Sequence, residues 1–376
     1  MLNCAVWQPG PAHMPISSIH IDTRPDWRGG QNQVLLTLHG LKARGHAVEL
    51  LALDGGELKH RALDEGFHVH AIPANSVRWD GSTLLRKLMG ARRYDIVHAH
   101  DPHGLTLAWL ARAHRSAVLI AQRRVANPLS RGPFALARYR AARRIFAVSK
   151  YIAESVVRSG IPANQIEVIY EGVRLPQQTT RGEREISREH WKIAGADTLL
   201  GCVGYLLPEK GQEALIRALP AIQKDFPACH LLLAGDGPSR PALEKLAYEL
   251  NVYRSVLFAG FVEHVESVYH ALDIFLFPSL AEPLGTSMLA AMSYGLPVVG
   301  VASGGIPEIV ASEKNGLLVP KPDPDAFAVC VKRLLRNREE ARRFGDAARA
   351  TIAEKFTDDR MVEATLESYL ALLKQN

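Results

Sequence analysis

Four segments in the second half of the chain combine glycines with charged side chains in a pattern that suits phosphate binding. They are 203-VGYLLPEKG-211, 234-AGDGP-238, 277-FPSLAEPLGTSMLAAM-292 and 304-GGIPEIV-310. Each follows an apolar run of strand length, and three of them lead into helical patterns. Helix N-termini carry unpaired N–H groups and a partial positive charge, which attract phosphate, and Lys210 adds a full charge. The segments therefore predict a phosphate site around Lys210.

Such a site needs a scaffold that gathers the ends of several strands, and the apolar pattern provides one. Strand-sized runs alternate with helical patterns from Ile16 to about Tyr170, and again from Leu199 onward. This alternation predicts two doubly wound parallel α/β domains, with ligands at the carboxyl ends of the strands. We expect domains over 14–175 and 196–356, a polar linker over 176–195 and a C-terminal helix over 357–376. A chain of 376 residues is long enough for two such cores.

Taken together, the four segments resemble the donor-binding domain of the family 4 glycosyltransferases. The first half is similar to the same family in the segments 28-RGGQNQVLLTLHGLKARGHAVELL-51, 95-DIVHAHDPHG-104, 148-VSKYIAESV-156 and 168-VIYEGV-173. The resemblance implies the GT-B architecture, in which two Rossmann-like domains face each other across a cleft. The first domain would bind the acceptor and the second the nucleotide-sugar, and the last helix would pack back on the first domain.

The same resemblance implies an activity. We expect a retaining, metal-independent glycosyltransferase of the hexosyltransferase type, which moves a sugar from a nucleotide-sugar to a lipid-linked or cell-envelope saccharide acceptor. Lipopolysaccharide or envelope polysaccharide biosynthesis is the expected setting. The nucleotide-diphosphate-sugar is a substrate, so no cofactor is expected. No metal is expected either, because no D-x-D motif stands in a suitable loop.

Individual residues follow from the family's motifs. His100 and Glu282 are the expected catalytic residues, with His100 contacting the reacting sugar and Glu282 holding sugar hydroxyls. Lys210 would stabilise the departing diphosphate, which itself takes the proton of the acceptor hydroxyl. The expected donor-binding residues are Gly29, Gly30, Lys210, Gly235, Gly237, Leu284, Gly285, Thr286 and Ser287.

Three positions depart from the family's pattern. Tyr205 stands where the family often has an Arg that helps to hold the diphosphate, and Glu171 stands where Asn is usual. Ala290 replaces the second Glu of the acidic motif, which normally accepts hydrogen bonds from the ribose. Losing that contact costs about 1–3 kcal/mol unless another group replaces it. These departures leave two alternatives open: a degenerate relative that binds a sugar-nucleotide or a partner without transfer, and a GT-B nucleotide-sugar epimerase.

Positive charge is concentrated in one part of the chain. Between Arg78 and Lys150 there are fifteen Lys or Arg and three acidic residues, an excess of +12 in a chain whose total is +6. This asymmetry predicts an anionic partner for the first domain, and we expect an anionic membrane surface or acceptor. A solvated basic surface is the alternative. The residues expected on the acceptor or membrane side are Arg123, Arg124, Arg140, Arg143 and Arg144, the last three on one helix face.

Other classes of protein fit the sequence less well. Aromatic residues that could stack on bases are sparse among the basic residues, so nucleic acid is not the expected partner. A dinucleotide-dependent oxidoreductase needs G-x-G-x-x-G after the first strand, where this chain has Gly29-Gly30-Gln31. The four cysteines are scattered, and residues 1–15 lack the features of a signal peptide. We therefore expect a cytoplasmic protein, with peripheral association at the inner face of the cytoplasmic membrane.

Overall fold

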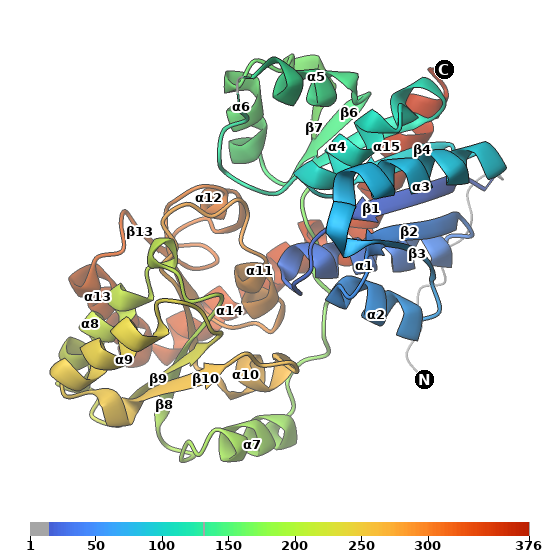
Figure 1. Cartoon of the computed structure of the whole chain (residues 1–376). Helices are drawn as coiled ribbons and strands as arrows, with labels where there is room; N and C mark the ends of the chain where they lie inside the picture. The colour runs from blue at the N-terminus through green and yellow to red at the C-terminus, as the bar shows by residue number, and fades with distance from the viewer. Residues whose placement is uncertain (1–14, 131, 376) are drawn as a thin grey trace. The chain divides into compact units, whose positions relative to one another are not determined.

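The structure is a computed structural model that describes residues 15–130 and 132–375 (Figure 1). Cys4 and the rest of residues 1–14, which belong to the segment without signal-peptide features, lie outside the described residues. Within the described ranges, every helix is too short or too polar to span a membrane. Short 3₁₀ helices occur at Ala74–Ser76, Ala113–Arg115, Ala163–Gln165, Pro208–Lys210 and Tyr253–Ser255.

The first half of the chain forms a seven-stranded sheet in the order β3-β2-β1-β4-β5-β6-β7 (Figure 1). Strand β1 lies between β2 and β4 and is parallel to both, so that His20 of β1 pairs in register with Leu50 on one side and His98 on the other. The strands are β1 (Ser17–Asp22), β2 (Ala47–Leu53), β3 (His68–Ile72), β4 (Ile96–Ala99), β5 (Val118–Arg123), β6 (Arg144–Ala147) and β7 (Ile166–Val168).

Helices connect these strands and cover the sheet. The first, α1 (Gly29–Ala43), packs Val34, Leu35 and Leu38 against Leu50 and Ala52 of β2. On the opposite face, Gly104 of α4 lies so close to Ile21 of β1 that a Cβ atom would be 3.1 Å from its side chain. The other helices of this half are α2 (Glu57–Asp64), α3 (Val77–Ala91), α4 (Pro102–Leu110), α5 (Pro133–Ala141) and α6 (Lys150–Arg158).

The second half forms a six-stranded sheet in the order β10-β9-β8-β11-β12-β13. Its strands are β8 (Thr198–Val203), β9 (Cys229–Ala234), β10 (Val256–Gly260), β11 (Ile274–Phe277), β12 (Val298–Val301) and β13 (Leu317–Val319). Its helices are α8 (Gln212–Gln223), α9 (Arg240–Glu249), α10 (Glu266–Ala271), α11 (Thr286–Ser293), α12 (Ile306–Ile309), α13 (Pro324–Arg336) and α14 (Arg338–Lys355). The two parallel sheets confirm the predicted fold class.

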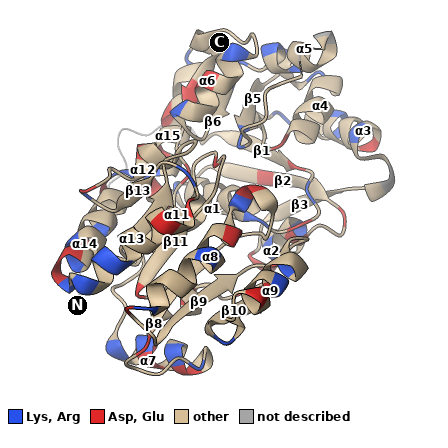
Figure 2. Ribbon diagram, turned by 90° about the vertical axis from the view of Figure 1, so that its left-hand side faces the viewer, with Lys and Arg blue, Asp and Glu red and all other residues tan. Residues whose placement is uncertain are grey.

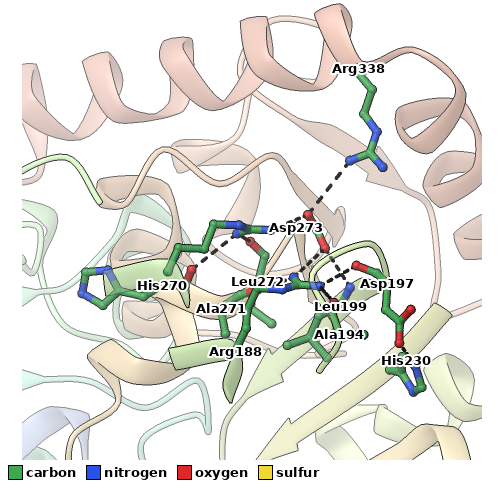
Figure 3. Close-up of polar contacts among 11 residues, drawn as sticks. Arg188, Ala194, Asp197, Leu199, His230, His270, Ala271, Leu272, Asp273 and Arg338 are labelled. Atoms are coloured by element: carbon green, nitrogen blue, oxygen red, sulfur yellow. Dashed lines mark hydrogen bonds and ion pairs between the residues drawn. The ribbon is translucent and has the colours of Figure 1, made fainter. Parts of the chain in front are cut away.

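The polar stretch predicted as a linker contains a helix, α7 (Arg181–His190), which begins with a capping box between Thr180 and Glu183. Arg188 of α7 is buried and donates to the Ala271 carbonyl at 3.1 Å and to the Asp273 carboxylate at 3.3 Å (Figure 3). The same carboxylate accepts the backbone N–H of Leu199 at 2.8 Å. The charged side chains of α7 therefore fix the starts of β8 and β11, the two central strands of the second sheet.

Contacts divide the chain into two units whose boundaries differ from the predicted domains. The first contains residues 1–123, 132–145 and 365–376, and the second contains residues 124–131 and 146–364. The helix α6 and the strand β7 thus group with the second unit. The last helix, α15 (Asp358–Leu373), contributes to both, and in the first unit its Tyr369 is completely buried.

Candidate active site

Lys210 lies where the sequence places the phosphate site, in the loop between β8 and α8. Its Nζ donates to Oε2 of Glu282 at 2.6 Å, and this ion pair is partly shielded from solvent. Gly211 follows with φ +71°, and a Cβ atom there would be 2.3 Å from the Pro278 carbonyl oxygen. Only glycine allows this turn and this approach, so Gly211 brings the Lys210 loop onto the loop that carries Glu282.

Glu282 is held from several sides in the loop that follows β11. Its side chain is 12% exposed, and the Ser279 hydroxyl donates to Oε2 at 2.9 Å. Its carbonyl accepts the N–H of Gly305 at 2.9 Å, and a Cβ atom on Gly304 would be 2.0 Å from that carbonyl. The Gly304-Gly305 turn therefore supports Glu282 through its backbone, which keeps the carboxylate in one place beside Lys210.

The helix α11 begins directly beside this pair. Gly285 precedes it with φ +109° and ψ +65°, and Leu284 before that is buried and anchors the turn. Thr286 and Ser287 form the first turn, whose N–H groups have no partner within the helix and suit an anionic ligand. Lys210, Glu282 and the start of α11 thus come together as the sequence predicts, within one unit.

The glycines of 234-AGDGP-238 make close backbone contacts with the loop after β8. A Cβ atom on Gly235 would be 2.0 Å from the Gly204 carbonyl oxygen, and one on Gly237 would be 2.4 Å from that of Leu206. These glycines let the β9 loop pass against the loop that carries Lys210. A direct role of Gly235 and Gly237 in donor binding stays a prediction.

The two departures from the family's motif lie at the same site. Tyr205 is 43% exposed in the loop after β8, and its carbonyl accepts from the Gln212 side chain at 3.2 Å. Ala290 lies half-buried on α11, five residues after Gly285, and its side chain is only a methyl group. The motif's second carboxylate is therefore missing from this helix.

Glu171, the third unusual position, forms an ion pair with Arg124 at 2.8 Å. Burial raises the pKa of Glu171, the Arg124 guanidinium opposes that rise, and the nearby Glu282 carboxylate adds to it. The pair therefore lies within electrostatic range of the Lys210–Glu282 pair. The sequence singles out both residues but not their pairing, since they are 47 positions apart and no local pattern connects them.

A further contact that the sequence did not suggest involves Glu308 of α12. Its carboxylate accepts the N–H groups of Lys150 and Tyr151, at 2.8 and 2.9 Å, at the start of α6. The Tyr170 hydroxyl donates to it at 2.9 Å, and burial together with this hydrogen bond raises the pKa of Tyr170. The N-terminus of α6 is thus already occupied by a carboxylate of the chain itself.

The expected residues of the first unit lie at the ends of two neighbouring strands. Gly29 and Gly30 are the first residues of α1, after β1, and the Gln31 side chain in the same turn donates to Asp22 at 3.1 Å. His100 follows β4 and is buried, and its backbone N–H donates to the Ile21 carbonyl at 2.8 Å.

Asp101 joins these two strand ends. Its carboxylate caps α4 by accepting the N–H groups of His103 and Gly104, and it also accepts the N–H of Thr23 at 2.8 Å. Asp followed by Pro at the first helical position is a recognisable helix start, so the capping role of Asp101 could have been predicted from the sequence. The cap fixes the loop on which His100 stands.

His100 is one of three buried histidines on the same face of the sheet. Its Nε2 lies 2.9 Å from Nδ1 of His20, and its ring is stacked on His98 with ring centroids 4.0 Å apart. Their ligand atoms all lie within 4.8 Å, as do those of Glu49, His68 and His70 elsewhere among the described residues. These distances would also suit a metal ion, although hydrogen bonds within the chain already engage the three buried rings.

The basic residues are placed differently from the prediction. The helix α5 ends at Ala141 and Arg144 begins β6, so Arg140, Arg143 and Arg144 do not share a helix face. Arg123 is buried with its guanidinium 3.5 Å from the Tyr139 hydroxyl, and Arg124 is paired with Glu171. A helix pattern was expected across Ala142, but the backbone is extended there.

Two Rossmann-like sheets, with a lysine–carboxylate pair beside the start of a helix in the second, are the architecture of the GT-B glycosyltransferases. Residues 27–176 match the model described as Glycosyltransferase Family 4, and residues 183–351 match the model described as Glycosyl transferases group 1. The chain belongs to the family 4 glycosyltransferases, which confirms the resemblance seen in the sequence.

Several known proteins are similar along much of the chain. An uncharacterised glycosyltransferase of Methanocaldococcus jannaschii is 28% identical over 361 residues, covering 88% of this chain and 91% of the relative. The GDP-mannose-dependent alpha-(1-6)-phosphatidylinositol monomannoside mannosyltransferase of Mycobacterium tuberculosis is 32% identical over 236 residues, covering 59% of this chain and 60% of the relative. The structure of HepE from Anabaena in complex with UDP and glucose superposes with a TM-score of 0.82 at 20% identity, covering 94% of this chain and 99% of HepE.

Proposed function

We propose that this glycosyltransferase is retaining and metal-independent, and that its donor is a nucleotide-diphosphate-sugar bound in the second unit. The observation that carries the proposal is the Lys210–Glu282 pair at 2.6 Å, beside the start of α11. A diphosphate bound there would receive a full positive charge from Lys210 and N–H groups from the helix start. Lys210 can thereby supply the charge stabilisation that other transferases obtain from a metal ion.

In this mechanism the bond between the anomeric carbon and the leaving phosphate oxygen breaks as the acceptor hydroxyl attacks from the same face. The proton of that hydroxyl moves to the departing diphosphate. Lys210 stabilises the negative charge that develops on the diphosphate. Glu282 accepts hydrogen bonds from the sugar, and His100 is the second proposed catalytic residue, in contact with the sugar. The retained configuration follows from attack on the face that the leaving group vacates.

The proposed acceptor is a lipid-linked or cell-envelope saccharide, and the proposed location is the cytoplasmic face of the membrane. The mycobacterial relative acts on a phosphatidylinositol monomannoside, whose acceptor sugar is carried by a lipid. Twelve of the fifteen Lys and Arg residues between Arg78 and Lys150 belong to the first unit of this chain, and Lys and Arg are visible around α3 and α5 in Figure 2. A basic face is what a protein needs to work on lipid-anchored substrates at an anionic bilayer.

The structure supports a revised set of membrane-facing residues. The helix α3 packs against α4, and α4 packs against α5, so these three helices form one layer of the first unit. Trp79 of α3 and Phe134 of α5 are 68% and 78% exposed. Exposed basic residues on the same two helices are Arg78, Arg86, Lys87 and Arg140. Exposed aromatic rings among cations match the composition of interfacial membrane-binding surfaces.

The proposal is tested by offering a panel of UDP-, GDP- and other nucleotide-sugars to the purified protein. We expect one donor to raise the melting temperature, and its slow hydrolysis or transfer to release a sugar of the same anomeric configuration, as followed by NMR. Activity should be unchanged by EDTA. An inverted product, or dependence on a divalent ion, would contradict the proposed mechanism.

A non-catalytic relative is the second candidate, because Tyr205 and Ala290 remove two donor contacts of the family. In that case a nucleotide-sugar would raise the melting temperature but would not be consumed with any acceptor. An epimerase would instead convert the nucleotide-sugar into its epimer without any acceptor. The same panel, with the sugar products identified, separates these three outcomes.

A further inference from the structure

His20, His98 and His100 form a connected group in the first unit, and neither the sequence motifs nor the relatives assign a role to His20. His20 lies on β1 and His98 on the neighbouring β4, in register with each other, and His100 follows two residues later on the same face. All three side chains are buried, and His20 is completely inaccessible to solvent. Burial lowers the pKa of His20 to about 3, so this ring is neutral at any physiological pH.

Two proton arrangements fit the contacts around His20. In the one on which our proposal rests, the Ser18 hydroxyl donates to the Ala47 carbonyl, 3.4 Å away. The Ser18 oxygen then accepts Nε2–H of His20 at 3.2 Å. A neutral ring that donates from Nε2 has a lone pair on Nδ1. In this arrangement His100 donates from its own Nε2–H to Nδ1 of His20, across 2.9 Å.

His98 supports this arrangement from the other side of His100. The Tyr369 hydroxyl of α15 donates to Nδ1 of His98 at 2.7 Å, and Nε2–H of His98 donates to Oε1 of Gln122 at 3.2 Å. The ring of His98, fixed in this way, is stacked on that of His100 at 27° between the ring planes. The orientation of the His100 ring is thus determined by two neighbours, one through a hydrogen bond and one through stacking.

We propose that His20 is a positioning residue that holds His100 as the neutral tautomer with its proton on Nε2, so that Nδ1 is the hydrogen-bond acceptor of the ring. This inference rests on the proposed function, in which His100 contacts the donor sugar. A neutral ring that accepts at Nδ1 pairs with a hydroxyl and repels a carboxylate.

The tautomer can be read directly by NMR on the full chain labelled with ¹⁵N-histidine. In the wild type, the long-range ¹H–¹⁵N spectrum should show His100 as the Nε2–H form at pH 7. His20→Phe keeps a ring but removes the acceptor, so His100 should lose its single tautomer. His20→Asn places an amide oxygen near the position of Nδ1 and should restore it. Thr37→Val, which removes another buried hydrogen bond of this unit, should leave the spectrum of His100 unchanged.

Kinetics provide the second readout, on the donor that the panel identifies. His20→Phe should lower kcat by about tenfold or more, with KM for the donor changed by no more than about threefold, and His20→Asn should recover most of kcat. If His20→Phe does not fold, Ser18→Ala removes the acceptor for Nε2–H of His20 and should shift the His100 tautomer in the same direction.

Several results would overturn the inference. One is a wild-type His100 that carries its proton on Nδ1 or is charged at pH 7. Another is an unchanged tautomer and kcat in His20→Phe. A third is a stoichiometric metal ion, found by elemental analysis of the purified protein, with the three rings as its ligands. The NMR experiment needs no turnover. If no donor is consumed, the proposed function fails, but the spectra still show whether His20 determines the tautomer of His100.

Discussion

Lys210 and Glu282 are the residues on which the donor site depends most directly, because they form the charged contact at its centre. Their separation of 72 residues is closed by two glycine turns, at Gly211 and Gly304, each of which lets one backbone touch another. The chemistry of the pair could be predicted from the sequence because each residue stands in a recognisable segment. Their direct hydrogen bond could not, since it depends on how the two loops pack.

Lys210→Ala should lower kcat/KM by about a hundredfold or more, because the charge that stabilises the departing diphosphate is lost. Donor affinity, measured by calorimetry, should fall as well. Lys224→Ala, at the exposed end of α8, is the matched control and should behave like the wild type. Near wild-type turnover by Lys210→Ala would mean that the phosphate binds elsewhere.

Ala290→Glu should tighten donor binding by about tenfold, which is the value expected for one regained hydrogen-bonding contact to the ribose. Ala290 lies on α11, whose start faces the site, and its own carbonyl is engaged by the Ser293 hydroxyl at 2.7 Å. Ala290→Gln is a useful comparison, since it adds similar bulk without charge. Weaker binding of both variants would show that another side chain already fills the space.

At the scale of elements, the strands were predicted best. The strands β2, β3 and β11 each end directly before a turn-forming residue, which is Asp54, Pro73 and Pro278 respectively, so the sequence marks their ends clearly. The helix α7 was not predicted, because its ten residues are almost all polar and it is held by ion pairs rather than by an apolar face. Thr180 and Glu183 did carry a capping-box signal for its start.

The group of His20, His98 and His100 could be predicted from the sequence only in part. His98 lies on β4 and His100 follows directly after that strand, so their shared face could have been recognised from their spacing of two. The partnership with His20 depends on β1 lying beside β4, and that with Tyr369 depends on α15 reaching the first unit. Contacts of this kind come from topology, and a single sequence contains no local trace of them.

Asp273→Ala should destabilise the protein by about 3–5 kcal/mol, because buried Arg188 loses its countercharge. The effect should appear as a lowered melting temperature of the second unit, with Arg184 also losing its partner. Glu185→Ala breaks the exposed Arg181–Glu185 pair on the same helix and should change stability by less than about 1 kcal/mol. Equal effects of the two variants would contradict the anchoring role of α7.

Removal of residues 358–376 should leave the protein insoluble or inactive. The helix α15 buries Met361, Val362, Tyr369 and Leu372, so its loss exposes apolar surface and removes the hydroxyl that holds His98. Removal of only 374–376 is the control and should be tolerated. Solubility and activity of the two truncations give the measurement, and a soluble, fully active 1–357 chain would rule out this role.

At the scale of the whole molecule, the uneven charge predicts how the protein meets a membrane. Vesicle sedimentation should show binding that rises with the fraction of anionic lipid. Arg86→Glu, Lys87→Glu and Arg140→Glu together should weaken it by about a hundredfold or more, at about 1 kcal/mol for each cation removed. The matched control reverses three exposed cations of the second unit, Lys245, Arg342 and Lys355. Binding that ignores lipid charge, or equal loss in both triple variants, would exclude this surface.

The ion pair between Lys210 and Glu282 bears on how the proposed enzyme releases its spent nucleotide. A diphosphate that occupies Lys210 leaves the Glu282 carboxylate without its cation, and the sugar hydroxyls of an intact donor compensate it. Once the sugar has been transferred, Glu282 keeps the Ser279 hydroxyl but has lost the sugar hydroxyls, and its carboxylate then competes with the diphosphate for Lys210. Glu282 thus competes with the product nucleoside diphosphate for Lys210. The nucleoside diphosphate should therefore inhibit turnover less strongly than its contacts with Lys210 and the helix start would predict.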